Sequence, residues 1–122
     1  MSATVNVSLS FEKSGISESF SSAQTATMSV AGYKVQAPTF GTAASQISTA
    51  TLNTLGYAYL RSLVTTTQTT CTLTFGRLDG ATLHPVVKLR PGEPAMLRLA
   101  AGNYAAQGAA EGYRLLVAIL ED

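Results

Sequence analysis

Histidine and cysteine, two side chains common in acid–base and nucleophilic catalysis, each occur once in this chain. A Ser-His-Asp or Cys-His site would have to use His84, the one histidine, with Asp79 as its nearest upstream carboxylate. His84 precedes Pro85, which favours extended geometry at residue 84. No serine lies in a G-x-S-x-G elbow. We therefore expect His84 to be an ordinary surface residue and not a catalytic one.

The one cysteine, Cys71, excludes an internal disulfide. It alternates in phase with Leu73 and Phe75 in the segment TTCTLTF. Because cysteine behaves as a small apolar residue in protein cores, we expect Cys71 to be buried and inert. The alternative is a reactive thiol.

The carboxylates give no clear acid–base pair. A glycosidase needs two of them across a cleft, and most of the seven in this chain fall in predicted turns or at the C-terminus. The seven are Glu12, Glu18, Asp79, Glu93, Glu111, Glu121 and Asp122. The sequence has no Cys/His pair for zinc, no calcium loop and no glycine-rich phosphate loop. We expect no enzymatic activity, no catalytic residue, no cofactor and no metal.

Aromatic residues offer one further kind of site, because sugar-binding faces commonly rest on exposed aromatic rings. The chain has no tryptophan, and its tyrosines lie in strand-like patterns: Tyr33, Tyr57, Tyr59, Tyr104 and Tyr113. We expect them to be half-buried packing residues. A sugar-binding face remains the alternative.

Composition indicates a protein that contacts other proteins. The chain has 122 residues, a net charge of +1 and 12% charged residues, against about a quarter in a typical domain. This charge predicts neither nucleic-acid nor anionic-membrane binding. A surface poor in charge favours association, although a threonine-rich β protein would look the same.

The start MSATVNVSLS does not resemble a signal peptide, and no apolar run is long enough to span a bilayer. We therefore expect synthesis in a cytoplasm.

Alternation of apolar and polar residues predicts strands throughout the chain. The strands predicted in this way are residues 4–11, 25–31, 33–37, 55–64, 70–75 and 104–107. Residues 113–120 are apolar on both faces, which is typical of a central strand covered on both sides. A helix start is the alternative for this run, but the run is short and follows Gly112, which favours a strand. Residues 17–23 read as a polar connection. Residues 39–54 fit a long loop, a wandering edge strand or a surface arm.

The segment LHPVVKLRPGEPAMLRL, residues 83–99, predicts two strands folded back on each other. Pro91 and Gly92 suit the two central positions of a type II turn. Pro94 lacks a backbone donor, so the beginning of the returning strand should be unpaired or at an edge. The charged turn from Arg90 to Glu93 is expected to be solvated, with contact to a neighbouring subunit as the alternative. A second turn is expected at residues 78–81.

Eight or nine short strands separated by turn signals predict an all-β fold. The pattern favours an antiparallel β-sandwich, jelly-roll-like or Ig-like. One domain is expected over residues 1–122, with a possible N-terminal arm at residues 1–10 and an irregular loop at residues 39–54.

Three segments resemble a type of small tailed-bacteriophage virion protein: GYAYLRSL, HPVVKLRPGEPAMLRLAAG and YRLLVAILED. They lie in residues 56–122, about half of the chain. The resemblance implies an all-β virion component. Among these, a capsid decoration or cement protein fits best, because it is small, poor in charge and free of catalytic groups.

This resemblance implies a set of partners and a location. The partners would be the major capsid protein or another virion protein, and further copies of the chain in a homotrimer. Neither nucleic acid nor membrane is expected as a partner, and the protein would reside in the virion after synthesis in the host bacterial cytoplasm. The alternative is a tail- or fibre-associated structural module that binds host-surface glycan. We expect residues 1–11 or 39–54 to make the contacts beyond the domain.

Overall fold

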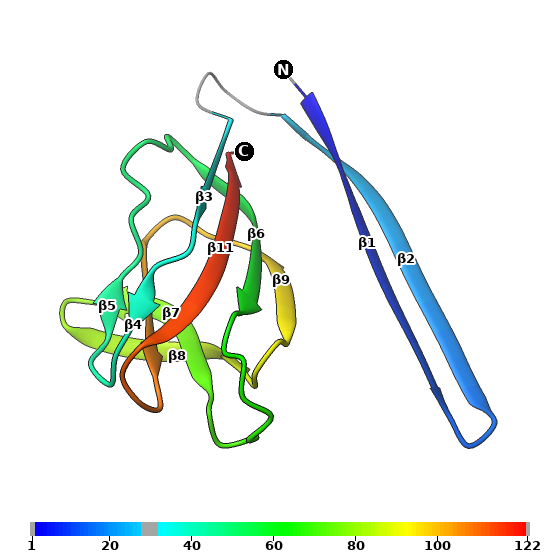
Figure 1. The fold of residues 1–122 in the computed structure, drawn as a ribbon. Helices are drawn as coiled ribbons and strands as arrows, with labels where there is room; N and C mark the ends of the chain where they lie inside the picture. The colour runs from blue at the N-terminus through cyan, green and yellow to red at the C-terminus, as the bar shows by residue number, and fades with distance from the viewer. Residues whose placement is uncertain (1, 28–31, 122) are drawn as a thin grey trace.

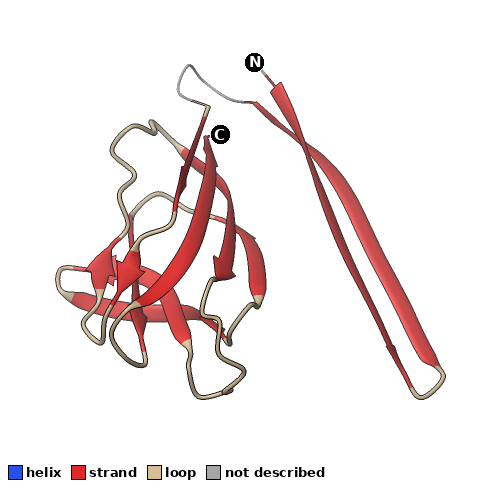
Figure 2. Ribbon diagram, in the orientation of Figure 1, coloured by secondary structure: helices blue, strands red, loops and turns tan. Residues whose placement is uncertain are grey.

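The computed structural model describes residues 2–27 and 32–121. These residues form eleven strands and no helix, and every strand pair is antiparallel (Figures 1 and 2). The predicted all-β, antiparallel class is confirmed, while the predicted count of eight or nine strands was too low. Nothing in the described ranges forms a helix that could span a membrane.

Two sheets make up the body of the molecule. The first has the strand order β3-β11-β6-β9, with a short strand β4 also paired to β11; the bounds are β3 (Tyr33–Gln36), β4 (Thr39–Phe40), β6 (Leu55–Ser62), β9 (Pro94–Arg98) and β11 (Tyr113–Glu121). The second has the order β5-β10-β7-β8; the bounds are β5 (Ser45–Gln46), β7 (Leu73–Asp79), β8 (Thr82–Leu89) and β10 (Asn103–Gly108).

The buried cluster takes residues from both sheets. Leu60, Leu115 and Val117 are fully buried members from the first sheet. Phe75 and Tyr104 come from neighbouring strands of the second, and their rings stack with centroids 5.6 Å apart. On β6 and β11, alternating positions give one face to this core, as the period of two predicted.

The prediction of a hairpin over residues 83–99 was wrong. The turn itself forms: Gly92 has a φ of 78°, and the Glu93 amide donates to the Arg90 carbonyl oxygen at 3.1 Å. However, β8 pairs with β7 while β9 pairs with β6, so the turn carries the chain from one sheet to the other. The physical reason is that turn residues fix a local reversal but not the strand's hydrogen-bonding partner. The edge position expected for the strand that begins at Pro94 is confirmed.

The hairpin that does form here joins β7 to β8 through the predicted turn, with Asp79 opposite Thr82. Its register shifts at Phe75/Gly76, where Val86 is the extra residue of a β-bulge. Gly76 is buried, and a Cβ there would overlap the His84 carbonyl oxygen. The close approach of the two backbones at the bulge therefore requires glycine.

Strand β11 is central in its sheet, as predicted, with β3 and β4 on one side and β6 on the other. Its odd-numbered residues from Leu115 to Ile119 are buried, but Leu116, Ala118 and Leu120 are only half-buried. Cover on both faces was expected, and the described residues supply it on one face only.

The N-terminal strands β1 (Ser2–Lys13) and β2 (Ile16–Thr27) form a two-stranded hairpin, which we call the arm. The arm extends beside the body, and neither strand has an extensive contact with a strand of the body (Figure 1). The strand predicted at residues 4–11 is confirmed. The polar connection predicted at residues 17–23 was wrong, because these residues belong to β2. Of the strand predicted at residues 25–31, residues 28–31 lie outside the described part.

Residues 39–54 behave as a wandering edge segment, one of the three structures considered for them. The segment pairs first with β11 in one sheet and then with β10 in the other. Phe40 and Ile47 anchor it in the core with exposed fractions of 2% and 1%. The segment is therefore part of the body, and it is not a surface arm.

Candidate interaction surface

Cys71 lies far from His84 and Asp79, the two residues considered for a catalytic site. Cys71 precedes β7 and is half-buried, whereas the sequence placed it inside a buried strand. Asp79 ends β7, and His84 lies opposite Arg77 on an exposed part of β8. The length of β7 thus separates the thiol from Asp79 and His84.

The carboxylates are dispersed over the molecule. Glu12 and Glu18 lie on the arm, Glu121 is fully buried in β11, and Asp122 is outside the described residues. Glu93 accepts the Arg90 amide hydrogen at 2.8 Å, which braces the turn between β8 and β9. In residues 2–27 and 32–121, no three His, Cys, Asp or Glu side chains gather as metal ligands would.

Glu111 joins the turn between β10 and β11 to residues 41–42. Its carboxylate accepts the amide hydrogen of Thr42 at 3.1 Å and the Thr42 hydroxyl at 3.2 Å. The same carboxylate occupies the space that a Cβ at Gly41 would need. Glu111 therefore has a local structural role that accounts for its position.

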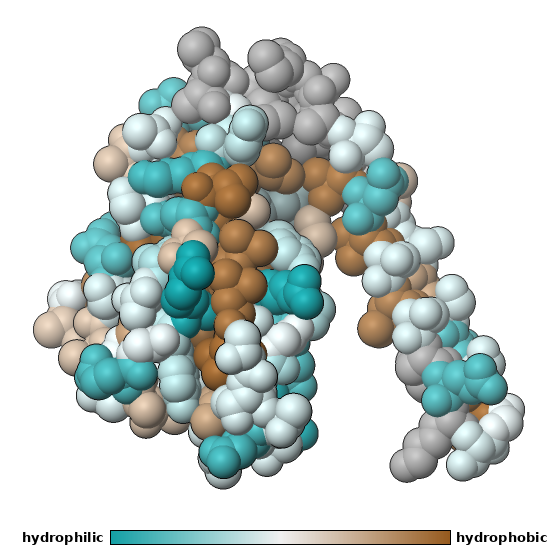
Figure 3. Space-filling view, viewed as in Figure 1, coloured by the Kyte–Doolittle hydropathy of each residue, from teal (hydrophilic) through white to brown (hydrophobic). Residues whose placement is uncertain are grey.

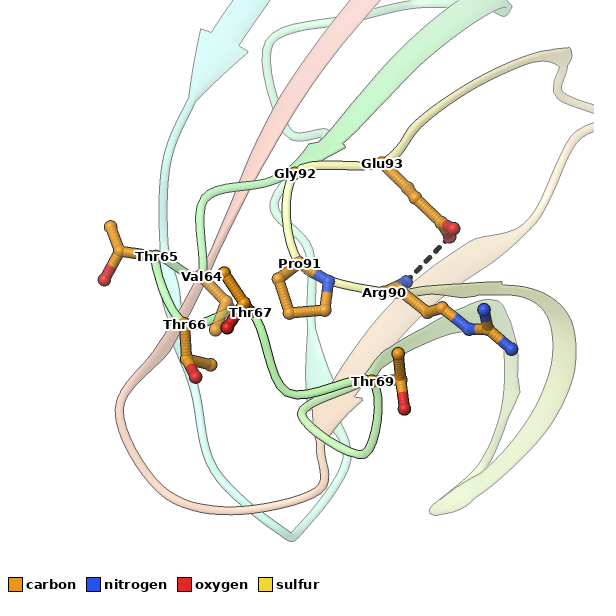
Figure 4. A pocket seen from close by; sticks show the side chains of 9 residues that line it. All are labelled: Val64, Thr65, Thr66, Thr67, Thr69, Arg90, Pro91, Gly92 and Glu93. Atoms are coloured by element: carbon orange, nitrogen blue, oxygen red, sulfur yellow. Dashed lines mark hydrogen bonds between the residues drawn. The ribbon is translucent and has the colours of Figure 1, made fainter.

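A pocket of about 480 Å³ lies between residues 64–69 and the turn after β8 (Figure 4). Figure 4 shows the Pro91 ring directed toward Val64 and Thr67, while the Arg90 side chain extends away from them. The lining also includes Thr65, Thr66, Thr69, Glu93 and the backbone of the turn. The pocket is open and its exposed lining is mainly apolar, so it shows no set of polar groups arranged around a ligand.

Cys71 has a defined environment despite lying outside the core. Its thiol is 3.7 Å from the Gln68 side-chain oxygen, to which it donates. A hydrogen bond with Cys71 raises the pKa of the Tyr113 phenol, with smaller contributions from desolvation and from the thiolate charge. The Tyr113 phenol therefore lies beside the Cys71 thiol.

The outward side of the β3-β11-β6-β9 sheet, which we call the outer face, is apolar and aromatic. The strand registers place Val35, Ala118, Tyr59 and Met96 in one row across four strands. Tyr33 and Val35 on the edge strand are 64% and 56% exposed, and Tyr59 is also exposed. The prediction that all five tyrosines are half-buried was wrong for Tyr33, Tyr59 and the buried Tyr104.

The outer face also carries positive charge. Arg61 on β6 and Arg114 on β11 alternate with buried residues, and Arg98 on β9 follows the half-buried Leu97. The Arg98 guanidinium lies 5.3 Å from the centre of the Tyr57 ring, a cation–π distance. Among the described residues at outward strand positions of this sheet, none is a carboxylate.

The arm presents a second apolar surface. Its register puts Val5, Val7, Leu9, Ile16 and Phe20 on one side, which we call the arm's apolar face. Val5 is buried, but Leu9, Ile16 and Phe20 are 57–61% exposed. The opposite side is lined by exposed small polar residues such as Asn6 and Ser8. Figure 3 shows hydrophobic side chains on both the arm and the body.

Sequence reasoning found half of this arrangement. The period of two in residues 4–11 already places Val5, Val7 and Leu9 on one face, but it gives no indication that this face lacks cover.

Comparison with known proteins adds no relative: no family model matches the chain, and no curated protein matches its sequence. The interaction surfaces therefore rest on the geometry described above.

Proposed function

We propose that this chain is a structural component of a bacteriophage virion, a capsid decoration or cement protein that binds and stabilises the assembled head. The observation that carries the proposal is the pair of exposed apolar surfaces, the arm's apolar face and the outer face. A soluble monomer seldom leaves such surfaces uncovered, and larger ones mark contacts with other proteins. The resemblance of residues 56–122 to small phage virion proteins selects a virion from the possible assemblies.

The proposed mechanism is added contact area between capsid subunits. Many weak contacts repeated by the symmetry of a shell give a large total stabilisation. The proposed partners are the major capsid protein or another virion protein, and further copies of the chain in a homotrimer. The two packed sheets would form a sandwich of jelly-roll or Ig-like topology. The proposed location is the virion, after synthesis in the host bacterial cytoplasm.

Sedimentation with capsid shells tests this role. Purified protein is mixed either with assembled shells that lack it or with unassembled capsid protein, and each mixture is sedimented. A cement protein sediments with shells, saturates at a fixed ratio and raises the temperature at which they break. The absence of sedimentation with shells, together with an unchanged breaking temperature, contradicts the proposal.

Exposed aromatic rings favour a second candidate, a tail- or fibre-associated module that binds host-surface glycan. Tyr33 and Tyr59 lie exposed on the outer face. Exposed aromatic rings are suited to stacking on sugar rings. Binding of the isolated protein to a glycan array or to host cells would support this function, whereas a cement protein binds only assembled shells.

A further inference from the structure

Each chain carries two exposed apolar surfaces that its own described residues leave largely uncovered. The arm's apolar face includes Leu9 and Phe20, paired across the hairpin and both more than half exposed. The outer face includes Val35 and Tyr59, in one row with Ala118 between them. Both surfaces are faces of β-sheet, so they can stack face to face as sheets do.

We propose that the arm's apolar face packs on the outer face of a second copy of this chain, so that every copy gives an arm and receives one. A second copy can cover both apolar surfaces at once, because its arm covers the outer face and its outer face covers the arm. The two surfaces are then present in equal numbers, and no other protein is needed. The inference rests on the proposed structural role and deepens it by naming the surfaces through which copies associate.

The area favours reciprocal exchange over a single contact. Each arm strand has 12 residues, about 40 Å at the rise of an antiparallel strand, and two strands make a face roughly 10 Å wide. Covering one such face removes about 800 Å² from the two partners together, less than the roughly 1,200 Å² of a small stable interface. Two such contacts between a pair of chains reach about 1,600 Å², the standard size. In a closed ring of copies, each chain also takes part in two contacts, one through its arm and one through its outer face.

The charges of the two surfaces are complementary. The outer face carries Arg61, Arg98 and Arg114 without a described carboxylate at an outward strand position. Glu18 is exposed and lies on the same side of the arm as Leu9. An arm docked on the outer face would bring Glu18 to an arginine-bearing surface. Opposite charges steer and orient such a contact.

The polar side of the arm supports one-sided docking. Asn6, Ser8 and Ser10 on β1 and Ser19 and Ser21 on β2 are exposed and uncharged. Hydroxyl and amide groups of this kind remain solvated when the other side is covered. The arm is thus suited to burial on one side only, because its other side can stay in contact with water.

Cross-linking between two kinds of single-cysteine chain tests the pairing. In a Cys71→Ser background, one chain carries Leu9→Cys and the other Val35→Cys, and a short thiol cross-linker is added to the mixture. We expect a cross-linked heterodimer. Two controls should give little product: Ser8→Cys on the other side of the arm, and Val86→Cys on the other sheet, where Val86 is slightly more exposed than Val35.

Light scattering on the full chain gives the second measurement. The unmodified protein should have a mass that is a multiple of one chain, and Leu9→Asp with Phe20→Asp should reduce it to one chain. Ser8→Asp adds a charge to the opposite side and should leave the mass unchanged. A monomeric unmodified protein overturns the proposal. Cross-links confined to Leu9→Cys chains alone also overturn it, because they indicate arm-to-arm contact.

Shell binding separates this inference from the proposed function. An arm variant that is monomeric yet sediments with shells as the unmodified protein does would leave the cement role intact and place shell contacts elsewhere. A protein that exchanges arms but never sediments with shells would retain the self-association and contradict the cement role. A chain that carries both Leu9→Cys and Val35→Cys gives one further test. Cross-links that form only within single monomers of this chain overturn the exchange between copies.

Discussion

Replacing Gly76 by alanine should destabilise the body of the protein through a backbone clash. The added Cβ would lie 2.8 Å from the carbonyl carbon of His84 and 2.9 Å from the Cα of Pro85, and closer still to the His84 carbonyl oxygen. Ordinary contact between such atoms needs about 3.5 Å or more. Because the obstacle is backbone and not a flexible side chain, strands β7 and β8 must move apart at the bulge.

The expected cost follows from two effects. Overpacking a close-packed site costs about 1–3 kcal/mol, and each ladder hydrogen bond weakened by the separation adds about 1 kcal/mol. We expect Gly76→Ala to lower the free energy of unfolding by about 2–4 kcal/mol, a large share of the 5–15 kcal/mol typical of a domain. Urea unfolding followed by circular dichroism measures it.

A matched control is Gly80→Asn in the turn between β7 and β8. Gly80 has a φ of 62°, and a Cβ there would meet no atom within 4 Å. Asparagine tolerates this backbone conformation, so the control should cost well under 1 kcal/mol. Equal stability of Gly76→Ala and the unmodified protein would refute the bulge geometry.

Two further changes test the core and the Cys71 environment. Phe75→Ala removes a fully buried ring stacked on Tyr104 and should cost about 3–5 kcal/mol in urea unfolding; a cost below 1 kcal/mol would contradict this core. The raised pKa of Tyr113 favours its neutral phenol in the fold, so its contribution to stability is complete below pH 10 and is lost as the pH rises through the folded pKa. Cys71→Ala should lower the Tyr113 pKa toward its usual value, as followed by phenolate absorbance against a Tyr113→Phe blank; an unchanged titration would contradict the contact.

Local signals in the sequence predicted turns better than strand partners. Pro91 and Gly92 fixed a reversal that the structure confirms, yet β8 and β9 enter different sheets. The reason is physical: the residues of a turn determine the direction of the backbone over four residues. Which strand lies alongside is decided by burial of whole faces, including residues far apart in the sequence.

The arm contains a strand, β2, most of which the sequence did not predict. Ser14 and Gly15 both have positive φ values, 49° and 84°, which is the pattern of a two-residue hairpin turn. The strand that follows was missed because β2 has few apolar residues at alternating positions, so its period is faint. Its pairing with β1 supplies the regularity that its own sequence lacks. A Ser-Gly turn after a clear strand was the signal available.

Strand β11 links the fold to the proposed assembly. Its sequence is apolar at every position from Leu115 to Leu120, the pattern of a strand covered on both faces. In the described structure, the core covers one face, and Leu116, Ala118 and Leu120 remain half-buried on the other. A strand that needed only one cover would tolerate polar residues on its outward side, as the arm does at Asn6 and Ser8. The apolar outward side of β11 therefore favours a second cover from outside the body, and the arm of another copy has the width and chemistry to provide it.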